Sequence, residues 1–122
     1  MSLLDVNIGK VELIAMMIFT TGCIVDHITT YYGLLVPTIE EANPVVLFMI
    51  GAGIWNAVEF LIIAIGNGSG FILSGEKSRG IMTMLIVTLT VAGLVRLIAG
   101  VHNIMLISNV GRVLGTVSMG HV

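Results

Sequence analysis

The sequence predicts an all-α membrane protein in which a single domain, residues 1–122, crosses the bilayer three times. Apolar residues make up 57% of the chain and charged residues only 10%, whereas about a quarter of an average soluble domain is charged. Mean hydropathy is +1.10, and three apolar stretches each reach the length of about 20 residues that spans a bilayer core as helix. A soluble domain of this size could not cover so much apolar surface.

Each expected span contains one charged residue away from its ends and is bounded by segments rich in turn-forming residues. The spans are residues 11–35, 44–65 and 81–107. Their charged residues are Asp26, Glu59 and Arg96. Asn43 is placed to cap the second helix, which begins with Pro44. Residues 66–80 contain five glycines and are expected to form a loop rather than a continued helix.

The C-terminal tail, residues 108–122, has apolar residues at helical spacing, namely Val110, Val113, Leu114 and Val117. This pattern predicts a short interfacial segment or an extension of the third span.

Basic residues near the span ends predict the orientation in the cell membrane. Lys10, Lys77 and Arg79 fall on the side of the N-terminus, and Arg112 falls on the other side. Because basic residues accumulate in the cytoplasm, the N-terminus is expected to be cytoplasmic.

Composition argues against several classes of function. A net charge of −2 with only five basic residues gives no footprint for nucleic acid. The single cysteine, Cys23, cannot form a disulfide within the chain and lies in an apolar run, where an unreactive buried thiol is expected. No Ser–His pair has a spacing typical of nucleophilic catalysis. The sequence therefore predicts no cofactor and does not favour an enzyme.

Polar residues are expected to converge at one end of the bundle. Asp26 lies fifteen residues along the first span and Arg96 lies fifteen residues along the third, so both stand about 22 Å from the cytoplasmic end. The cluster predicted around this pair consists of Asp26, His27, Thr30, Glu41, Asn43, Arg96, His102 and Asn103. Charged groups at membrane depth usually meet a partner or water. They therefore mark either a buried structural pair or a transport site.

A second intramembrane acid, Glu59, is expected with Asn56 on the middle span. Counting six residues from Ile65 places Glu59 about 9 Å into the inner half, where this chain offers no basic residue at the same depth. We therefore expect a largely neutral carboxyl group, or one that is compensated by a neighbouring subunit or a water-filled path.

Small and polar residues line one face of each expected helix. The stripes are Gly22, Cys23, Asp26, Thr29, Thr30 and Gly33; Ala52, Trp55, Asn56 and Glu59; and Ala92, Gly93, Arg96, Ala99, Gly100 and Asn103. Small residues permit close helix approach, so the stripes are expected to be the interior seams of a bundle. His27 and His102 lie off these stripes and are candidates for a second contact surface or for metal binding.

Two short motifs resemble an uncharacterised family of small prokaryotic integral membrane proteins. Asp26-His-Ile-Thr-Thr30 is similar to that family's Asp-x-x-x-Thr segment, and Glu41-Ala-Asn-Pro44 is similar to its Glu-x-Asn-Pro turn. The match covers about residues 20–50. The resemblance implies that these residues form one unit, and it brings no activity with it.

Three functions are consistent with these observations. The first is a small non-catalytic membrane subunit that packs through its polar and small-residue faces against copies of itself or larger membrane subunits, with the lipid bilayer as its surroundings. The second is an oligomeric channel or a proton or ion carrier lined by Glu59 and the pair of Asp26 and Arg96. The third is a subunit of a metal-dependent membrane enzyme that uses His27 and His102.

Overall fold

The computed structural model describes residues 8–73 and 79–119, and of residues 114–119 it describes only the backbone. Helix is the only regular secondary structure in this part of the chain. Its helices are α1 (Lys10–Leu34), α2 (Pro44–Gly51), α3 (Trp55–Leu73) and α4 (Arg79–Met119). Within the described residues, α1, α3 and α4 are long and apolar enough to cross a membrane. The prediction of an all-α protein with three helices that could span a membrane is confirmed.

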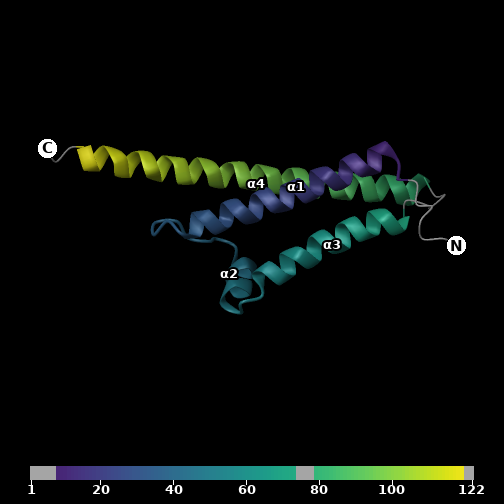
Figure 1. Ribbon diagram of the computed structural model, residues 1–122, viewed down its shortest axis with the longest axis horizontal. Coiled ribbons are helices and arrows are strands. Elements are labelled where there is room, and N and C mark those ends of the chain that lie inside the picture. The colour runs from purple at the N-terminus through teal and green to yellow at the C-terminus, as the bar shows by residue number, and fades with distance from the viewer. Residues whose placement is uncertain (1–7, 74–78, 120–122) are drawn as a thin grey trace.

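The three long helices form a thin bundle in which α1 lies between the other two (Figure 1). Helices α1 and α4 run in the same direction and α3 runs in the opposite direction, so the chain termini lie at opposite ends. Contacts between α1 and α4 are extensive, whereas α3 packs mainly on α1. Helix α2 contacts only α3 among the described helices.

Glycines bring the backbones of α1 and α4 into direct contact. A Cβ atom at Gly22 of α1 would collide with the backbone of Gly93 on α4, and one at Gly93 would lie 2.6 Å from the carbonyl oxygen of Ile18. Gly100 approaches Val25 and Asp26 in the same way. The predicted small-residue stripes of the first and third spans therefore form one seam, as expected for helices that associate through small residues.

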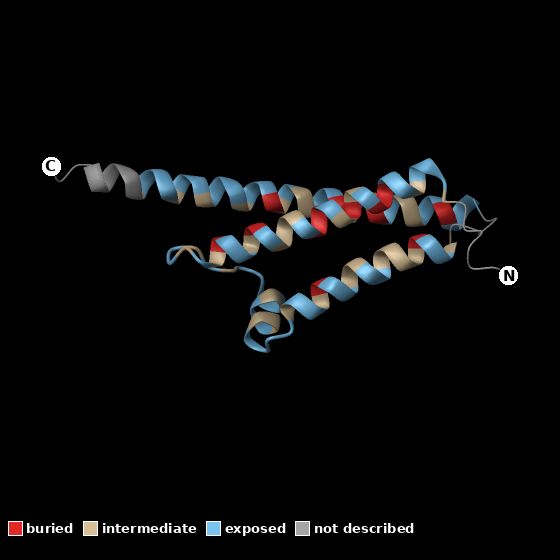
Figure 2. Cartoon of the chain, viewed as in Figure 1, coloured by how far each residue is buried: buried red, intermediate tan, exposed pale blue. Residues whose placement is uncertain are grey.

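Apolar packing continues this seam. The buried cluster consists of Ala15, Met16, Phe19, Cys23 and Leu89. In Figure 2 the buried positions follow the line where α1 meets its neighbours, and most of the remaining surface is exposed. In a membrane, apolar side chains on the outside of the bundle contact lipid. A small bundle therefore needs only a thin buried core.

The second span differs from its predicted position. Residues 44–65 do not form one helix, because the chain turns at Ala52–Ile54 between α2 and α3. Gly53 has a φ of 70°, a left-handed conformation that glycine adopts without steric cost. The spanning helix is therefore α3, which begins at Trp55, and α2 is a separate short helix before it.

The glycine-rich segment also differs from the prediction, since residues 66–73 continue α3 instead of forming a loop. Side chains at two of its glycines would collide with α1: a Cβ at Gly66 would meet the ring of Phe19, and one at Gly70 would lie 2.7 Å from Met16 Sδ. Helix propensity alone disfavours a helix at these glycines, but their lack of a side chain allows α3 to pack closely against α1. Residues 74–78 of the predicted loop lie outside the described residues.

The C-terminal tail extends the third span, which is the second of the two arrangements that its spacing predicted. Helix α4 continues without a break to Met119 and reaches well beyond the end of α1 (Figure 1). A separate interfacial segment is absent up to that residue. The side chains of Leu114 and Val117 lie outside the described residues.

The cytoplasmic position of the N-terminus stays a prediction, and cysteine labelling checks it. In a Cys23→Ser background, Gly9→Cys should react only with a reagent present on the cytoplasmic side. Thr38→Cys, in the connection between α1 and α2, should react only from outside, because α1 separates the two sites. Labelling of both sites from the same side would contradict α1 as a membrane span, and the reverse pattern would invert the orientation.

Candidate functional site: a charged cluster between three helices

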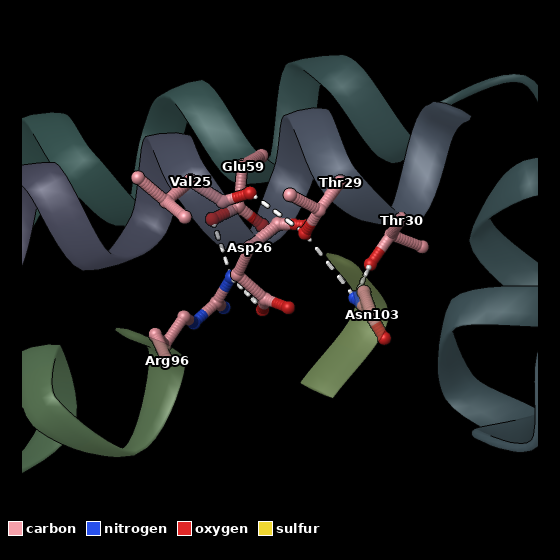
Figure 3. Close-up of polar contacts among 7 residues, drawn as sticks. All are labelled: Val25, Asp26, Thr29, Thr30, Glu59, Arg96 and Asn103. Atoms are coloured by element: carbon pink, nitrogen blue, oxygen red, sulfur yellow. Dashed lines mark hydrogen bonds and ion pairs between the residues drawn. The ribbon is translucent and has the colours of Figure 1, made fainter. Parts of the chain in front are cut away.

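Three charged side chains from three different helices meet inside the bundle (Figure 3). Arg96 Nη1 on α4 lies 2.6 Å from Glu59 Oε1 on α3 and 3.3 Å from Asp26 Oδ2 on α1. The side chain of Glu59 is 8% exposed, whereas that of Asp26 is 23% exposed. Arg96 is therefore shared unequally: the shorter contact goes to the more deeply buried carboxylate.

The predicted contact between Asp26 and Arg96 is present, but the expectation that Glu59 lacks a basic partner is wrong. The error follows from the position of the second span. Because α3 begins at Trp55 and runs to Leu73, Glu59 lies four residues from the start of the helix, about 6 Å along it, and on the same level as Arg96.

Hydrogen bonds extend the contact between α1 and α4 towards the C-terminal end of α1. The amide nitrogen of Asn103 donates to Thr30 Oγ1 at 3.0 Å and to Thr29 Oγ1 at 3.3 Å. The hydroxyl of Thr29 in turn donates to the carbonyl oxygen of Val25 at 2.8 Å. Figure 3 shows these side chains beside the ion pairs, further along α1 and α4. The polar residues of the two stripes are thus satisfied across the seam.

His27 contacts two residues at the start of α3. Its Nε2 lies 3.0 Å from Asn56 Oδ1, and its ring lies against Trp55 with 4.1 Å between the ring centroids. The oxygen of Asn56 can only accept a hydrogen bond, so Nε2 of His27 is the donor in this contact. Nδ1 is buried and has no hydrogen-bond partner among the described residues. The predicted second contact surface is present at His27.

The connection to α2 ends in a cap made by Glu41, Asn43 and Pro44, which are three of the five residues that the resemblance places in one unit with Asp26 and Thr30. Asn43 Oδ1 accepts the backbone N–H of Val45 at 3.0 Å, and Glu41 Oε1 accepts the N–H of Asn43 at 2.7 Å. Pro44 occupies the first turn, where its missing N–H costs no hydrogen bond. These bonds fix the start of α2 beside the charged cluster.

Two cavities adjoin this region. The charged cavity, of about 210 Å³, is lined by Asp26, His27, Thr30, Asn43, Val46, Trp55, Val95, Arg96 and Ala99. The linker cavity, of about 170 Å³, is lined by Thr29, Thr30, Gly33, Leu34, Ile39, Glu40, Glu41, Ala42, His102, Asn103, Leu106 and Ile107. Every residue of the predicted polar cluster lines one cavity or the other, and Thr30 lines both. Glu59 and Asn56 line a further hollow beside His27.

The two histidines do not come together, since His27 lines the charged cavity and His102 lines the linker cavity. Across residues 8–73 and 79–113, no group of three or more His, Cys, Asp and Glu side chains is placed to hold a metal ion. The geometry gives no support to a metal shared by His27 and His102.

One polar contact between spans was not predicted. Asn67 Nδ2 on α3 donates to Thr20 Oγ1 on α1 at 2.8 Å. Asn67 lies at helical spacing from Glu59, and this spacing was the available signal in the sequence. The glycines on either side of Asn67 led us to expect a loop instead. This contact and the charged cluster together attach α3 to α1 at two levels.

The fold and this cluster define a helical protein with three candidate membrane spans and charged side chains enclosed between them. The chain belongs to a family described as a domain of unknown function (DUF5658), whose model matches residues 17–109. That range includes every residue of the charged cluster. No curated protein and no solved structure matches the chain.

Proposed function

We propose that this chain is a small non-catalytic subunit of a complex in the cell membrane. In this complex it associates with copies of itself or with larger membrane subunits. The length of α4 carries this proposal. Its apolar part, Arg79–Val113, has 35 residues and is about 52 Å long, whereas a bilayer core is about 30 Å thick. Helix α1, with 25 residues, is about 37 Å long. A considerable apolar length of α4 therefore extends past the bundle.

Exposed side chains at the point where α4 leaves α1 support association. Ile104, Met105 and Leu106 are 48%, 59% and 41% exposed, and they stand beside the last turn of α1. Arg112, further along, is a charged residue that marks the approach to water. Apolar helix surface beyond the hydrocarbon is unfavourable in water, and a second subunit would cover it. The resemblance to small prokaryotic membrane proteins accords with a role of this kind.

Cross-linking in native membranes tests the subunit proposal. In a Cys23→Ser background, Ser108→Cys on the projecting part of α4 should give a cross-linked product, whose mass distinguishes a second copy from a larger partner. Phe60→Cys, which is also exposed but lies on α3, is the matched control and should give none. A monomer in native mass spectrometry together with no product at Ser108→Cys would contradict association through α4.

A second candidate function, a proton or ion carrier, is favoured by the charged cavity beside the ion pairs. Intramembrane charge next to a polar cavity is a usual mark of an ion path. Proton and ion flux into liposomes should occur with the wild type and be lost in Asp26→Asn. Glu12→Gln, which removes a carboxylate in the first turn of α1 and outside both cavities, should retain it. Absence of wild-type flux under every gradient would remove this candidate.

A further inference from the structure

The charges of the charged cluster, which consists of Asp26, Glu59 and Arg96, do not cancel. Two carboxylates, Asp26 and Glu59, face the single guanidinium of Arg96. If all three groups are ionised, the cluster has a net charge of −1 within the span region. Uncompensated charge at membrane depth is strongly disfavoured. One additional positive charge is therefore required to neutralise the cluster.

We propose that this charge is a proton that Asp26 exchanges with the charged cavity. Both the site and the ligand follow from the unequal sharing of Arg96. Glu59 makes the shorter contact and is almost fully enclosed, so Glu59 and Arg96 form a neutral pair. Asp26 makes the longer contact, has the more exposed side chain and lines the cavity. It is the surplus carboxylate of the three.

The geometry is compatible with both protonation states of Asp26. Oδ2 is the oxygen that faces Arg96 Nη1 at 3.3 Å, and it can accept a hydrogen bond as a carboxylate or as the carbonyl of a carboxylic acid. A hydronium ion would give its proton to Oδ1 and leave a water molecule, and the reverse step would return the proton. No other bond has to form or break.

The lining of the charged cavity favours a proton over a metal cation. His27 lines the same cavity as Asp26, but its Nε2 lies 3.0 Å from Asn56 Oδ1 and its Nδ1 is buried, so neither ring nitrogen is open to a metal ion. Across residues 8–73 and 79–113, no group of three or more His, Cys, Asp and Glu side chains is placed to hold one.

The remaining charged and titratable groups around Asp26 come from each neighbouring segment. They are Cys23 and His27 on α1, Glu41 in the connection to α2, Glu59 on α3 and Arg96 on α4. Glu41 adds negative charge and is held by its bond to the N–H of Asn43. None of these groups supplies a second fixed cation, so protonation of Asp26 is the change that neutralises the cluster.

Asp26 and the proton would be the binding residue and the ligand of the proposed carrier, and their physiological role rests on that proposed function. Proton binding by Asp26 can be measured without transport. The chain has only two aspartates, Asp5 and Asp26. Full-length protein in lipid nanodiscs, labelled with ¹³C at the aspartate carboxyl and carrying Asp5→Asn, therefore gives one carboxyl resonance in solid-state NMR. At neutral pH we expect the chemical shift of a carboxylic acid, which changes to that of a carboxylate on alkalinisation.

A Glu59→Gln substitution in the same protein removes the surplus charge, so the Asp26 resonance should then be that of a carboxylate at neutral pH. Glu12→Gln, in the first turn of α1 and outside both cavities, should leave the resonance unchanged. A carboxylate shift for Asp26 before any change at Glu59, or an acid shift that Glu59→Gln does not alter, would overturn the inference. An acid shift in a protein without flux would reject the carrier and retain the proton site.

Discussion

Replacing Arg96 by glutamine is expected to destabilise the bundle by roughly 3–5 kcal/mol, because Glu59 is then buried without a counter-charge. The substitution also removes the group that joins α3 and α4 to α1 at this level. Chemical or steric-trap unfolding in detergent or bicelles measures the loss. Arg112→Gln is the matched control on the same helix: its side chain is exposed, so a change within about 0.5 kcal/mol is expected. Equal effects of the two substitutions would contradict a buried role for Arg96.

The second large effect is expected at the glycine seam. Gly22→Ala should destabilise the protein by about 1–3 kcal/mol, since the new methyl group meets the backbone of Gly93, which cannot rotate away as a side chain could. The helices α1 and α4 would have to separate. Measurement of the unfolding free energy under the same conditions checks this.

Gly68→Ala provides the control for that effect. Gly68 is also a helical glycine in a membrane span, but a Cβ atom there would meet nothing within 4 Å. Because alanine favours a helix by up to about 1 kcal/mol over glycine, Gly68→Ala should be neutral or stabilising. If Gly22→Ala and Gly68→Ala behave alike, the close approach of α1 and α4 is wrong.

The sequence was sufficient to predict the number of spans and the partnership of Asp26 and Arg96. Equal distances along two helices that run in the same direction bring these residues to one level, whatever the details of packing. The seam followed from the same logic, since residues three, four and seven positions apart along a helix share a face, and small residues recur at these spacings on both helices. These are local regularities, and they survive errors of a residue or two in the helix ends.

The middle helix could not be placed from local pattern. Its apolar residues continue from Pro44 without interruption, so nothing in the hydropathy separates α2 from α3, and the turn depends on the left-handed conformation of Gly53. At the other end, Gly66 and Gly70 are tolerated in a helix because they fit against Phe19 and Met16 of α1. Tertiary packing therefore overrides propensity, and the resulting shift changes Glu59 from an unpaired acid into the main partner of Arg96.

Double-mutant cycles on the charged cluster test the central claim, that Arg96 is held mainly by Glu59 and that Asp26 is the surplus acid. The unfolding free energy is measured for Arg96→Gln combined with Glu59→Gln and, separately, with Asp26→Asn. We predict that the first combination recovers much of the loss caused by Arg96→Gln and that Asp26→Asn alone costs little. The coupling of Arg96 with Glu59 should exceed its coupling with Asp26. Additive losses for Arg96 and Glu59, or the larger coupling for Asp26, would contradict it.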